Sequence, residues 1–597
     1  MLTPQLKEGF LRAYDRASQN QQSVYPTLFP KGMALERAFA RAGGLLVAGT
    51  DPTGAGGVVA GFANQRQIEL LVEAGFTPLD AISIATLNGA KYLGRDARTG
   101  SYPFWSPDSR FVAFFADGKL KKMAVAGEAV QIICDAALGR GGSWNRDDVI
   151  IFTPEAVAVA LYRVSASGGV PTRLTELDPS RRETTHRWPL FLPDGRHFLF
   201  VAGNFSGETE GNAIYAGSLD SPQRTLLTSV FSNVAYSPAG FILYVKANHL
   251  VAQAFDAQRL LVTGEPTVVA DEVAYLPSLA YAAFSTSNTG MLVYQASSVA
   301  GLSELTWFDR AGRKIRSIGD RREYANPRVS PDGKRVAVDV VDPLGNVDIF
   351  VVDPASGQST RFTFDAAVEA IPIWSPDGGS IAYQSFRDGP GNVYRKVSSG
   401  AAPEAALLKL NVRSQPSDWS PDGAFVVYNA WSRSTGWDLW LLPIAGEREP
   451  RPFLQTKFDE DEGQFSPDGR WMAYTSNEKG RREVYVAPFP GPGGKWQISS
   501  AGGAQPRWRR DGRELFYLSP DHKLMAVDVR AAATFLVGSA AVLFQMRPRE
   551  MVSGTDRYIY DVSLDGRQFL VNATIEEASP SPVSIVLDWA ADLTRKE

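Results

Sequence analysis

The chain has 597 residues, of which 44% are hydrophobic and 11% aromatic, and its formal net charge is −4. This composition excludes a disordered chain, and the balanced charge provides no basic field for nucleic acid. The single cysteine, Cys134, excludes an internal disulfide and a cysteine-rich metal site. We expect a cytoplasmic protein, because residues 1–22 do not resemble a signal peptide and no apolar run reaches the roughly 20 residues of a membrane span.

The first 97 residues read as a small α/β segment. Helices are predicted from Thr3, over about Gly32 to Arg41, over Gln65 to Ala74, and from Thr77 to Gly94. Gly75 provides the C-cap of the third helix. Between the second and third helices, Leu45-Leu46-Val47-Ala48 is predicted to form a short buried strand, which ends in Gly49-Thr50-Asp51 before a glycine-rich loop.

The segment from Ala42 to Gly94 resembles the end of a metal-dependent amidohydrolase barrel. The resemblance depends on Gly49-Thr50-Asp51 at the strand end and on the Thr-Leu-Asn-Gly-Ala-Lys-Tyr-Leu-Gly of Thr86 to Gly94. It implies that Asp51 is a metal-binding, proton-shuttling aspartate and that a divalent metal such as zinc is the cofactor. A carboxylate at the tip of a barrel strand is where such barrels place their chemistry.

The residues themselves do not complete that metal site. A catalytic zinc needs about three protein ligands, and this segment contains no histidine. The four histidines of the chain, at positions 186, 197, 249 and 522, all lie further along it. We therefore interpret Asp51 as a vestigial metal ligand or as an ordinary strand-end carboxylate, and we expect no catalytic residue and no cofactor. The alternative is a metal-dependent hydrolase of C–N bonds.

From about residue 100 onward the chain repeats one phrase eleven times. An aromatic or β-branched residue precedes Ser-Pro-Asp-Gly or a degenerate copy of it. The copies begin at Trp105, Trp144, Phe191, Tyr236, Phe284, Val329, Trp374, Trp419, Phe465, Trp508 and Val562. The clearest aspartates, from Asp332 to Asp468, recur every 45 or 46 residues. Units of 40–45 residues with four short strands are typical of β-propeller blades.

The repeated phrase is a turn followed by a strand. Ser-Pro-Asp-Gly suits a type I turn closed by glycine, so we expect these residues to form turns and not to bind ligands. Second strands are predicted at the same offset in each repeat, for example Ile381 to Tyr383 and Met472 to Tyr474. Third strands follow, such as Trp437 to Leu442, and then a weaker fourth strand such as Arg361 to Thr363.

The repeats resemble the TolB-like, WD-type propeller region attached to many bacterial serine/threonine kinases. The resemblance depends on Tyr102 to Asp108, Gly139 to Trp144, Leu305 to Asp309 and Pro488 to Pro490. In such relatives another blade would precede Tyr102, so we expect the first propeller to close imperfectly. No kinase motif and no Gly-x-Ser-x-Gly peptidase motif occurs in the chain.

Several smaller features carry separate predictions. The acidic run from Asp459 to Glu462 is expected to be a solvated loop, with a cation or basic-peptide site at a pore mouth as the alternative. The arginines around Trp508 are expected to decorate a turn, with an anionic partner as the alternative. His186 is expected to be structural, and the tryptophans of the repeat, such as Trp105 and Trp374, to pack between blades.

Together these patterns predict a mainly β chain of two consecutive β-propellers, with about five and then six four-stranded blades, behind a short fragment of an amidohydrolase-type (β/α)8 barrel. The predicted domains are residues 1–97, 98–318 and 319–597, with the second boundary at a register break from Ile315 to Tyr324. The final strand, from Val583 to Trp589, is expected to complete the last blade or to close the ring.

The function expected from this architecture is a non-catalytic, monomeric binding scaffold. Its partner would be a protein, peptide or small ligand at a propeller face, with neither nucleic acid nor a membrane span involved. A fusion of two gene pieces at a seam near residues 97–101 is a further interpretation of the two unlike parts of the chain.

Overall fold

The computed structural model describes residues 25–41, 71, 75–76, 101–116, 118–125, 130–155, 159–204, 211–296, 301–343, 345–432, 434–491, 493–531, 535–549, 551, 555–575 and 583–594. The chain divides into two units, Met1–Gly100 and Ser101–Glu597. The predicted seam at residues 97–101 spans this division.

The described part of the first unit is helical. Helix α2 spans Tyr25–Arg41 and ends where the sequence predicted, but it starts seven residues earlier than Gly32. Leu71 is helical, and the amide of Phe76 donates to its carbonyl oxygen at 3.1 Å, while Gly75 has a φ of +90°. These are features of a Schellman C-cap, as predicted for Gly75. The other predicted elements of this unit, and Asp51, lie outside the described residues.

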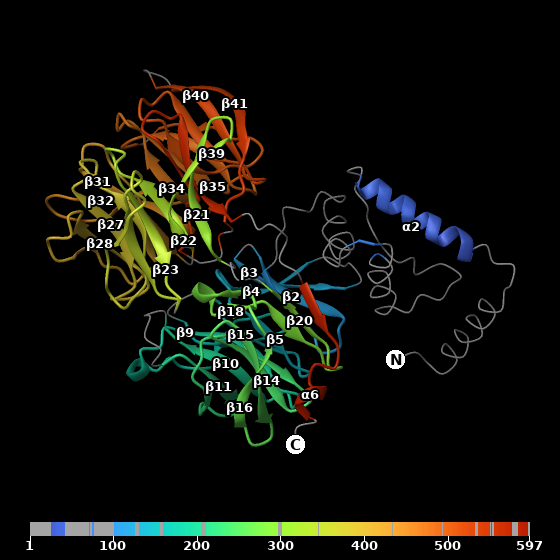
Figure 1. Ribbon diagram of the computed structural model, residues 1–597. Helices are drawn as coiled ribbons and strands as arrows, with labels where there is room; N and C mark the ends of the chain where they lie inside the picture. The colour runs from blue at the N-terminus through green and yellow to red at the C-terminus, as the bar shows by residue number, and fades with distance from the viewer. Residues whose placement is uncertain are drawn as a thin grey trace. The chain divides into compact units, whose positions relative to one another are not determined.

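The second unit consists almost entirely of antiparallel sheets, which we number as blades one to eleven in chain order (Figure 1). Four blades of the first propeller have four strands each. These are β1 Ser101–Trp105, β2 Phe111–Ala116, β3 Lys119–Ala124 and β4 Gln131–Asp135; β5 Gly142–Trp144, β6 Val149–Phe152, β7 Tyr162–Ser165 and β8 Thr172–Arg173; β9 Thr185–Phe191, β10 His197–Gly203, β11 Ala213–Ser218 and β12 Thr225–Thr228; and β13 Ala235–Ser237, β14 Phe241–Lys246, β15 His249–Asp256 and β16 Leu261–Ala270.

Blade five differs because its third strand comes from the far end of the chain. It contains β19 Phe284–Thr286, β20 Leu292–Gln295 and β44 Val583–Val586. Figure 1 shows the red β44 beside the green β20, and the two strands pair from Leu292 with Val586 to Gln295 with Val583. A small sheet of β17 Tyr275–Leu276 and β18 Tyr281–Ala282 precedes blade five, and the short helix α6 Ala591–Thr594 follows β44.

The second propeller has six blades. Its strands are β21 Ser303–Asp309, β22 Lys314–Val329, β23 Val336–Val341, β24 Val347–Val352, β25 Ser359–Arg361, β26 Glu369–Trp374, β27 Ser380–Ser385, β28 Asn392–Val397, β29 Ala405–Leu408, β30 Ser414–Trp419, β31 Phe425–Ser432, β32 Gly436–Pro443, β33 Arg451–Leu454, β34 Glu460–Phe465, β35 Trp471–Ser476, β36 Glu483–Pro488, β37 Trp496–Gln497, β38 Ala504–Trp508, β39 Glu514–Leu518, β40 Lys523–Ala531, β41 Phe535–Gln545, β42 Tyr560–Val562 and β43 Gln568–Thr574.

The second propeller closes by sharing strand β22 between two blades. Its first half pairs with β21, which pairs with β43, and together with β42 these strands make blade eleven. Its second half is the inner strand of blade six and pairs with β23. The inner strands β22, β26, β30, β34, β38 and β42 contact one another in that order, and β42 contacts β22. Closing the ring in this way gives each blade a neighbour on both sides, while outer strands such as β25 and β29 keep a short free edge.

The predicted domain boundary from Ile315 to Tyr324 lies within the continuous strand β22. The pairings correct one other prediction. The C-terminal strand completes neither the last blade nor the second ring, because β21 and β22 already supply the outer strands of blade eleven. Whether residues 98–318 and 319–597 fold as separate domains stays a prediction.

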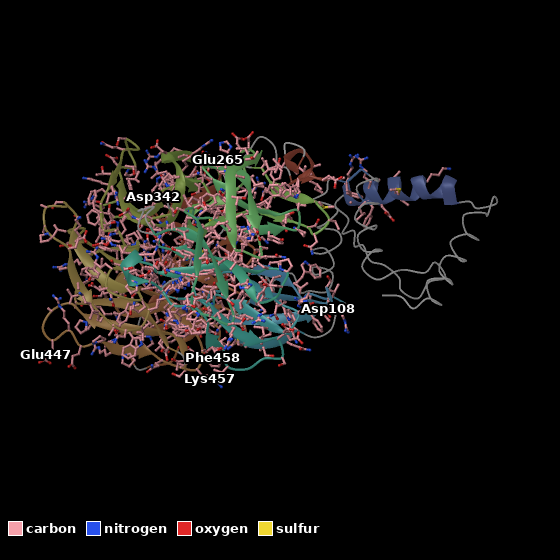
Figure 2. All side chains as sticks on the ribbon, turned by 90° about the horizontal axis from the view of Figure 1, so that it is seen from below. Asp108, Glu265, Asp342, Glu447, Lys457 and Phe458 are labelled. Carbon is pink, nitrogen blue, oxygen red and sulfur yellow. The ribbon has the colours of Figure 1, made fainter. Side chains whose placement is uncertain are left out.

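The Ser-Pro-Asp-Gly phrases form turns, as predicted. In the turn after β22, the Ser330 hydroxyl donates to Asp332 Oδ1 at 2.6 Å and accepts the Arg335 amide at 2.9 Å. Gly333 adopts a φ of +72°, which favours glycine. The Ser330 hydrogen bond lowers the pKa of Asp332. In the turn of blade one, Asp108 is exposed at the periphery of the unit (Figure 2).

Candidate binding site on the axis of the second propeller

Six residues at one position of the repeat line the axis of the second propeller. Each is the residue directly before the last residue of an inner strand. We call this set the axial ring, which consists of Arg328, Ile373, Asp418, Gln464, Arg507 and Asp561. Two arginines and two aspartates are therefore brought together at the centre of a β-structure.

Hydrogen bonds across the ring show that these side chains meet at the axis. Arg328, on blade six, donates from Nη1 to Gln464 Oε1 at 3.3 Å on blade nine. Its Nη2 donates to the carbonyl oxygen of Ser417 on blade eight. Blades eight and nine are not neighbours of blade six in the ring. These contacts must therefore cross the central channel.

A bulge in the inner strand precedes the axial residue in most blades. The pairing register shifts between Ala325 and Arg328, between Ala370 and Ile373, and at the same place in β30, β34 and β38. Residues in these bulges adopt left-handed backbone angles, among them the β-branched Ile371 with a φ of 58°. A bulge redirects the side chain that follows it, so this repeated distortion aims the axial residues.

Side chains of adjoining blades satisfy the amides that the bulges release. The amide of Ile371 donates to Asp339 at 3.0 Å, and the amide of Gln505 donates to Glu462 Oε2 at 2.6 Å. Gln505 in turn accepts the amide of Ile559 at 3.0 Å. Because a buried amide without a partner is costly, these bonds hold the distorted strands in place and connect blade to blade.

The two arginines of the axial ring lie against one aromatic ring. The guanidinium carbons of Arg507 and Arg328 are 3.9 and 4.8 Å from the ring centroid of the buried Tyr558. Cation–π contacts at these distances stabilise a buried positive charge. The contacts with Tyr558 therefore offset part of the repulsion between these two like charges.

Two carboxylates balance these charges. Arg507 Nε donates to Asp561 Oδ1 at 3.1 Å, and Asp561 Oδ2 accepts the amide of Val329 from the next blade at 2.7 Å. Asp418 Oδ2 accepts the amide of Phe465 at 2.9 Å in the same manner. Burial lowers the pKa of Arg328 and raises the pKa of Asp418. Burial opposes the charge of Arg507 too, but the carboxylate of Asp561 outweighs it and raises the pKa of Arg507.

Two donors of this cluster, Arg507 Nη2 and the Tyr558 hydroxyl, have no hydrogen-bond partner within the described part of the chain. Arg507 Nη2 is buried and has no hydrogen-bond partner among the described residues, whereas Nε and Nη1 bond to Asp561 and to the carbonyl oxygen of Pro506. A buried unpaired donor costs about 1–3 kcal/mol. The axial ring therefore has the capacity for one more hydrogen-bond acceptor.

A second charged group lies at the opposite end of the inner strands. Asp461 and Glu462 are buried, and Arg482 contacts both, at 3.0 and 3.4 Å. Arg557 Nη1 contacts Asp461 Oδ2 at 2.7 Å and stacks over Trp437. The prediction of a solvated acidic loop is therefore wrong for residues 460–462, which begin β34. Arginines neutralise Asp461 and Glu462, whereas Glu460 accepts hydrogen bonds from Thr456.

The other singled-out residues have mixed outcomes. Arg507 is buried and does not lie in a turn, contrary to the prediction. Trp508 is half-buried, and its indole nitrogen donates to the carbonyl oxygen of Gln464 at 3.2 Å. His186 is a buried structural histidine, as predicted, because its ring nitrogens lie 3.1 Å from Glu183 Oε2 and 2.7 Å from Thr175 Oγ1.

Of the repeat tryptophans expected to pack between blades, one does so and one does not. Trp374 bridges two blades, since its indole donates to the carbonyl oxygen of Arg328 at 3.0 Å. Trp105 is 59% exposed, so the prediction that it packs between blades is wrong.

Asp51 lies outside the described residues, so its environment is not given by the structure. Among the described residues, no group of three or more His, Cys, Asp or Glu side chains has the arrangement to hold a metal ion. No helix in the described part of the chain is long and apolar enough to cross a membrane.

The sequence contained a signal for the axial ring that the repeat obscured. In the second propeller the residue before the motif aromatic is charged or polar in five of six blades, whereas the first propeller has Phe104, Ser143, Leu190, Ala235 and Ala283 at this position. A comparison of this position among the eleven repeats would have distinguished the second propeller from the first.

Comparisons with known proteins agree with this fold. Residues 303–437 match the family model of the TolB β-propeller domain, so the chain contains a propeller of TolB type. An uncharacterized protein of Agrobacterium fabrum is 27% identical over 190 residues, which are 31% of this chain and 61% of that protein. The Tol-Pal system protein TolB of Bordetella pertussis is 31% identical over 142 residues, which are 24% of this chain and 32% of that protein.

The chain therefore spans less than two thirds of the length of these relatives. Among solved structures, a putative TolB from Agrobacterium tumefaciens is similar with a TM-score of 0.38 and 19% identity, over 46% of this chain and 99% of that one.

Proposed function

We propose that the chain is a β-propeller binding scaffold, and that a protein or peptide partner contacts the axial ring of the second propeller. The observation that carries this proposal is the buried Nη2 of Arg507, which has no partner among the described residues. A partner that brings a carbonyl or carboxylate oxygen to this nitrogen would recover the free energy that its burial costs. The proposed scaffold is of the TolB-like, WD-type kind, and residues 1–97 are an amidohydrolase remnant attached to it.

The proposal is supported by the difference between the two propellers. At the axial position of the repeat the first propeller carries Phe104, Ser143, Leu190, Ala235 and Ala283, none of which is charged. The aromatic rings of Tyr102 and Tyr281, with centroids 4.9 and 4.7 Å from that of Trp188, lie beside the buried Arg140 and Arg187. The second propeller has two arginines and two aspartates at that position instead. Burying charges is expensive, so a retained charged cluster suggests a role beyond packing.

The test uses Arg507→Lys, which keeps the positive charge beside Asp561 but removes Nη2. Full-length wild type and variant are isolated from the native cell with their partners, and the co-purifying proteins are quantified by mass spectrometry. We expect one partner to fall at least about tenfold with Arg507→Lys, in line with the loss of a charge-assisted hydrogen bond. Arg259→Lys, at an arginine whose side chain is 80% exposed, is the matched control and should change nothing. Equal recovery of every partner from Arg507→Lys and wild type would refute the proposal.

The alternative function is a metal-dependent hydrolase of C–N bonds that uses Asp51. It predicts about one bound zinc per chain and an amidase activity. Metal analysis of wild type and Asp51→Asn distinguishes the two functions. Zinc and amidase activity that are both lost in Asp51→Asn would favour the hydrolase.

A further inference from the structure

We propose that the second propeller joins two copies of this chain through strand β41, which pairs antiparallel with β41 of the other copy. The inference does not depend on the proposed binding function, because β41 is the outer strand of blade ten and not part of the axis. It arises from the length, exposure and composition of this strand compared with the other outer strands of the chain.

Strand β41 has a strand partner on one of its two sides within the described part of the chain. Blade ten has the order β38-β39-β40-β41, so β40 covers one edge of β41 and the other edge ends the sheet. Figure 1 shows β40 and β41 at the periphery of the second propeller. Residues 538–542 are all exposed, and Leu536 and Val542 are 56% and 54% exposed. The outer edge of β41 therefore presents backbone amides and carbonyls that can pair with another strand.

The other outer strands are protected against such pairing. Proteins blunt sheet edges by keeping them short or by placing charges and prolines on them. The outer strands with five residues or fewer are β4, β8, β12, β25, β29, β33, β37 and β44. Strand β16 has ten residues and β41 has eleven. Glu265 and Pro266 lie in the middle of β16, whereas β41 contains neither a charged residue nor a proline.

The composition of β41 favours a copy of itself as the partner. Because the strand carries no charge, it has nothing by which an oppositely charged partner would recognise it, and two copies can pair without placing like charges opposite each other. The small residues Gly538 and Ser539 precede Ala541, and the larger Val542 and Leu543 follow it. Antiparallel pairing about a two-fold axis near Ala541 sets the small side of each strand opposite the large side of the other. A two-fold contact requires self-complementarity of this kind.

The pairing of β41 with β40 shows which part of the edge is regular. Gly538 and Ser539 lie opposite the single residue Asp528, and Leu543 lies between two paired residues, so β41 has a bulge on each side of its centre. Residues from Ala540 to Val542 pair regularly with β40. Because bulges twist an edge away from a partner, the contact is confined to this centre, and we expect a weak association with a dissociation constant in the micromolar range. This inference opposes the monomer expected from the sequence.

The experiment places charges at the centre of the strand. Ala541→Lys and Ala541→Asp are made in the full chain, because pairing about a two-fold axis near Ala541 brings the two introduced side chains together. Val268→Lys is the matched control, since Val268 is 52% exposed on the other long outer strand, β16. Sedimentation velocity from about 1 to 50 µM measures the association of each protein and of an equimolar mixture of the two charged variants. Val542→Lys and Val542→Asp repeat the test if a first variant fails to fold.

We expect the wild type and Val268→Lys to associate equally, and each charged variant alone to associate at least about tenfold more weakly, because like charges then face each other. The equimolar mixture should recover the association, since a lysine then faces an aspartate. A monomeric wild type over the whole concentration range would overturn the proposal. Undiminished association of Ala541→Lys, or a mixture that associates as weakly as either variant alone, would also overturn it, because β41 would then not pair with its own copy.

Discussion

Single residues at equivalent positions of the repeat make the axes of the two propellers chemically different. The turn residues were predictable, since Ser, Pro, Asp and Gly have local reasons to occupy a turn. The axial residues were not, because Arg328 is defined by contacts to Ser417 and Gln464, which lie 89 and 136 residues away in the sequence. Such contacts depend on the closed ring, and no local pattern reports them.

Removal of one partner of the axial ion pair should be costly. Arg507→Met leaves Asp561 as a buried carboxylate without its counter-charge, which we expect to destabilise the second propeller by about 3–5 kcal/mol. The double variant with Asp561→Asn should recover more than half of this loss, since an asparagine oxygen still accepts the amide of Val329. Native-state hydrogen exchange of β38, β39 and β42 measures both. A double variant as unstable as Arg507→Met would show that packing, and not charge, sets the cost.

Asp348 should make the second propeller less stable as the pH rises. Burial raises the pKa of Asp348 to about 6, although Arg361 Nη2 lies 2.6 Å from its Oδ2. The folded protein therefore holds this proton more tightly than the unfolded chain. The resulting stability is present at low pH and lost as the pH rises through about 6. We expect a loss of about 2 kcal/mol between pH 4 and pH 7, with solvent screening taken into account.

Asp348→Asn should remove that slope, because asparagine does not titrate. Hydrogen exchange of β23 to β25 at several pH values measures the local free energy of opening in both proteins. Parallel pH profiles for the two proteins would show that another group is responsible.

At the scale of elements, the repeat predicted the strands well, and their partners less well. Second strands such as Ile381 to Tyr383 and Met472 to Tyr474 lie within β27 and β35, as predicted. The fourth strand of blade six is β25, Ser359–Arg361, two residues earlier than predicted. The partner of β44 could not be predicted, because an isolated apolar strand of four residues fits any open sheet edge.

The return of the chain's end to blade five predicts where a C-terminal substitution acts. Trp589 is buried beside Phe241, with ring centroids 5.9 Å apart. Trp589→Ala should destabilise the first propeller by about 3–5 kcal/mol and leave the second unchanged. Hydrogen exchange should increase in β13 to β16 and in β20, but not in β26 to β41. The reverse pattern would contradict the observed pairing of β44 with β20.

For the whole molecule, the fold class was predictable, whereas the order in which the chain builds the two rings was not. The chain leaves the first propeller after β20, builds the entire second propeller and then returns as β44. Residues 303–574 are therefore an insertion within the fifth blade of the first propeller. Periodicity counts blades along the chain, but it does not record which sheet edge a later strand joins.

The junction at residues 97–101 should be the first site of proteolytic cleavage. It joins two unlike sequence patterns at the division between the two units, and linkers between compact units are preferred cleavage sites. Limited proteolysis with mass spectrometry should yield a resistant fragment that starts near Ser101. Resistance throughout residues 1–95 under conditions that cleave elsewhere would contradict this.

The most direct test of the scaffold account is photo-crosslinking in the native cell from position 564. Leu564 is 37% exposed in the turn that follows Asp561, so a photoreactive residue there samples the end of the channel beside the axial ring. We expect a discrete crosslinked partner whose yield falls at least about tenfold when Arg507→Lys is added and is unchanged by Arg259→Lys. The same yield with Arg507→Lys as without it would contradict binding at the axial ring.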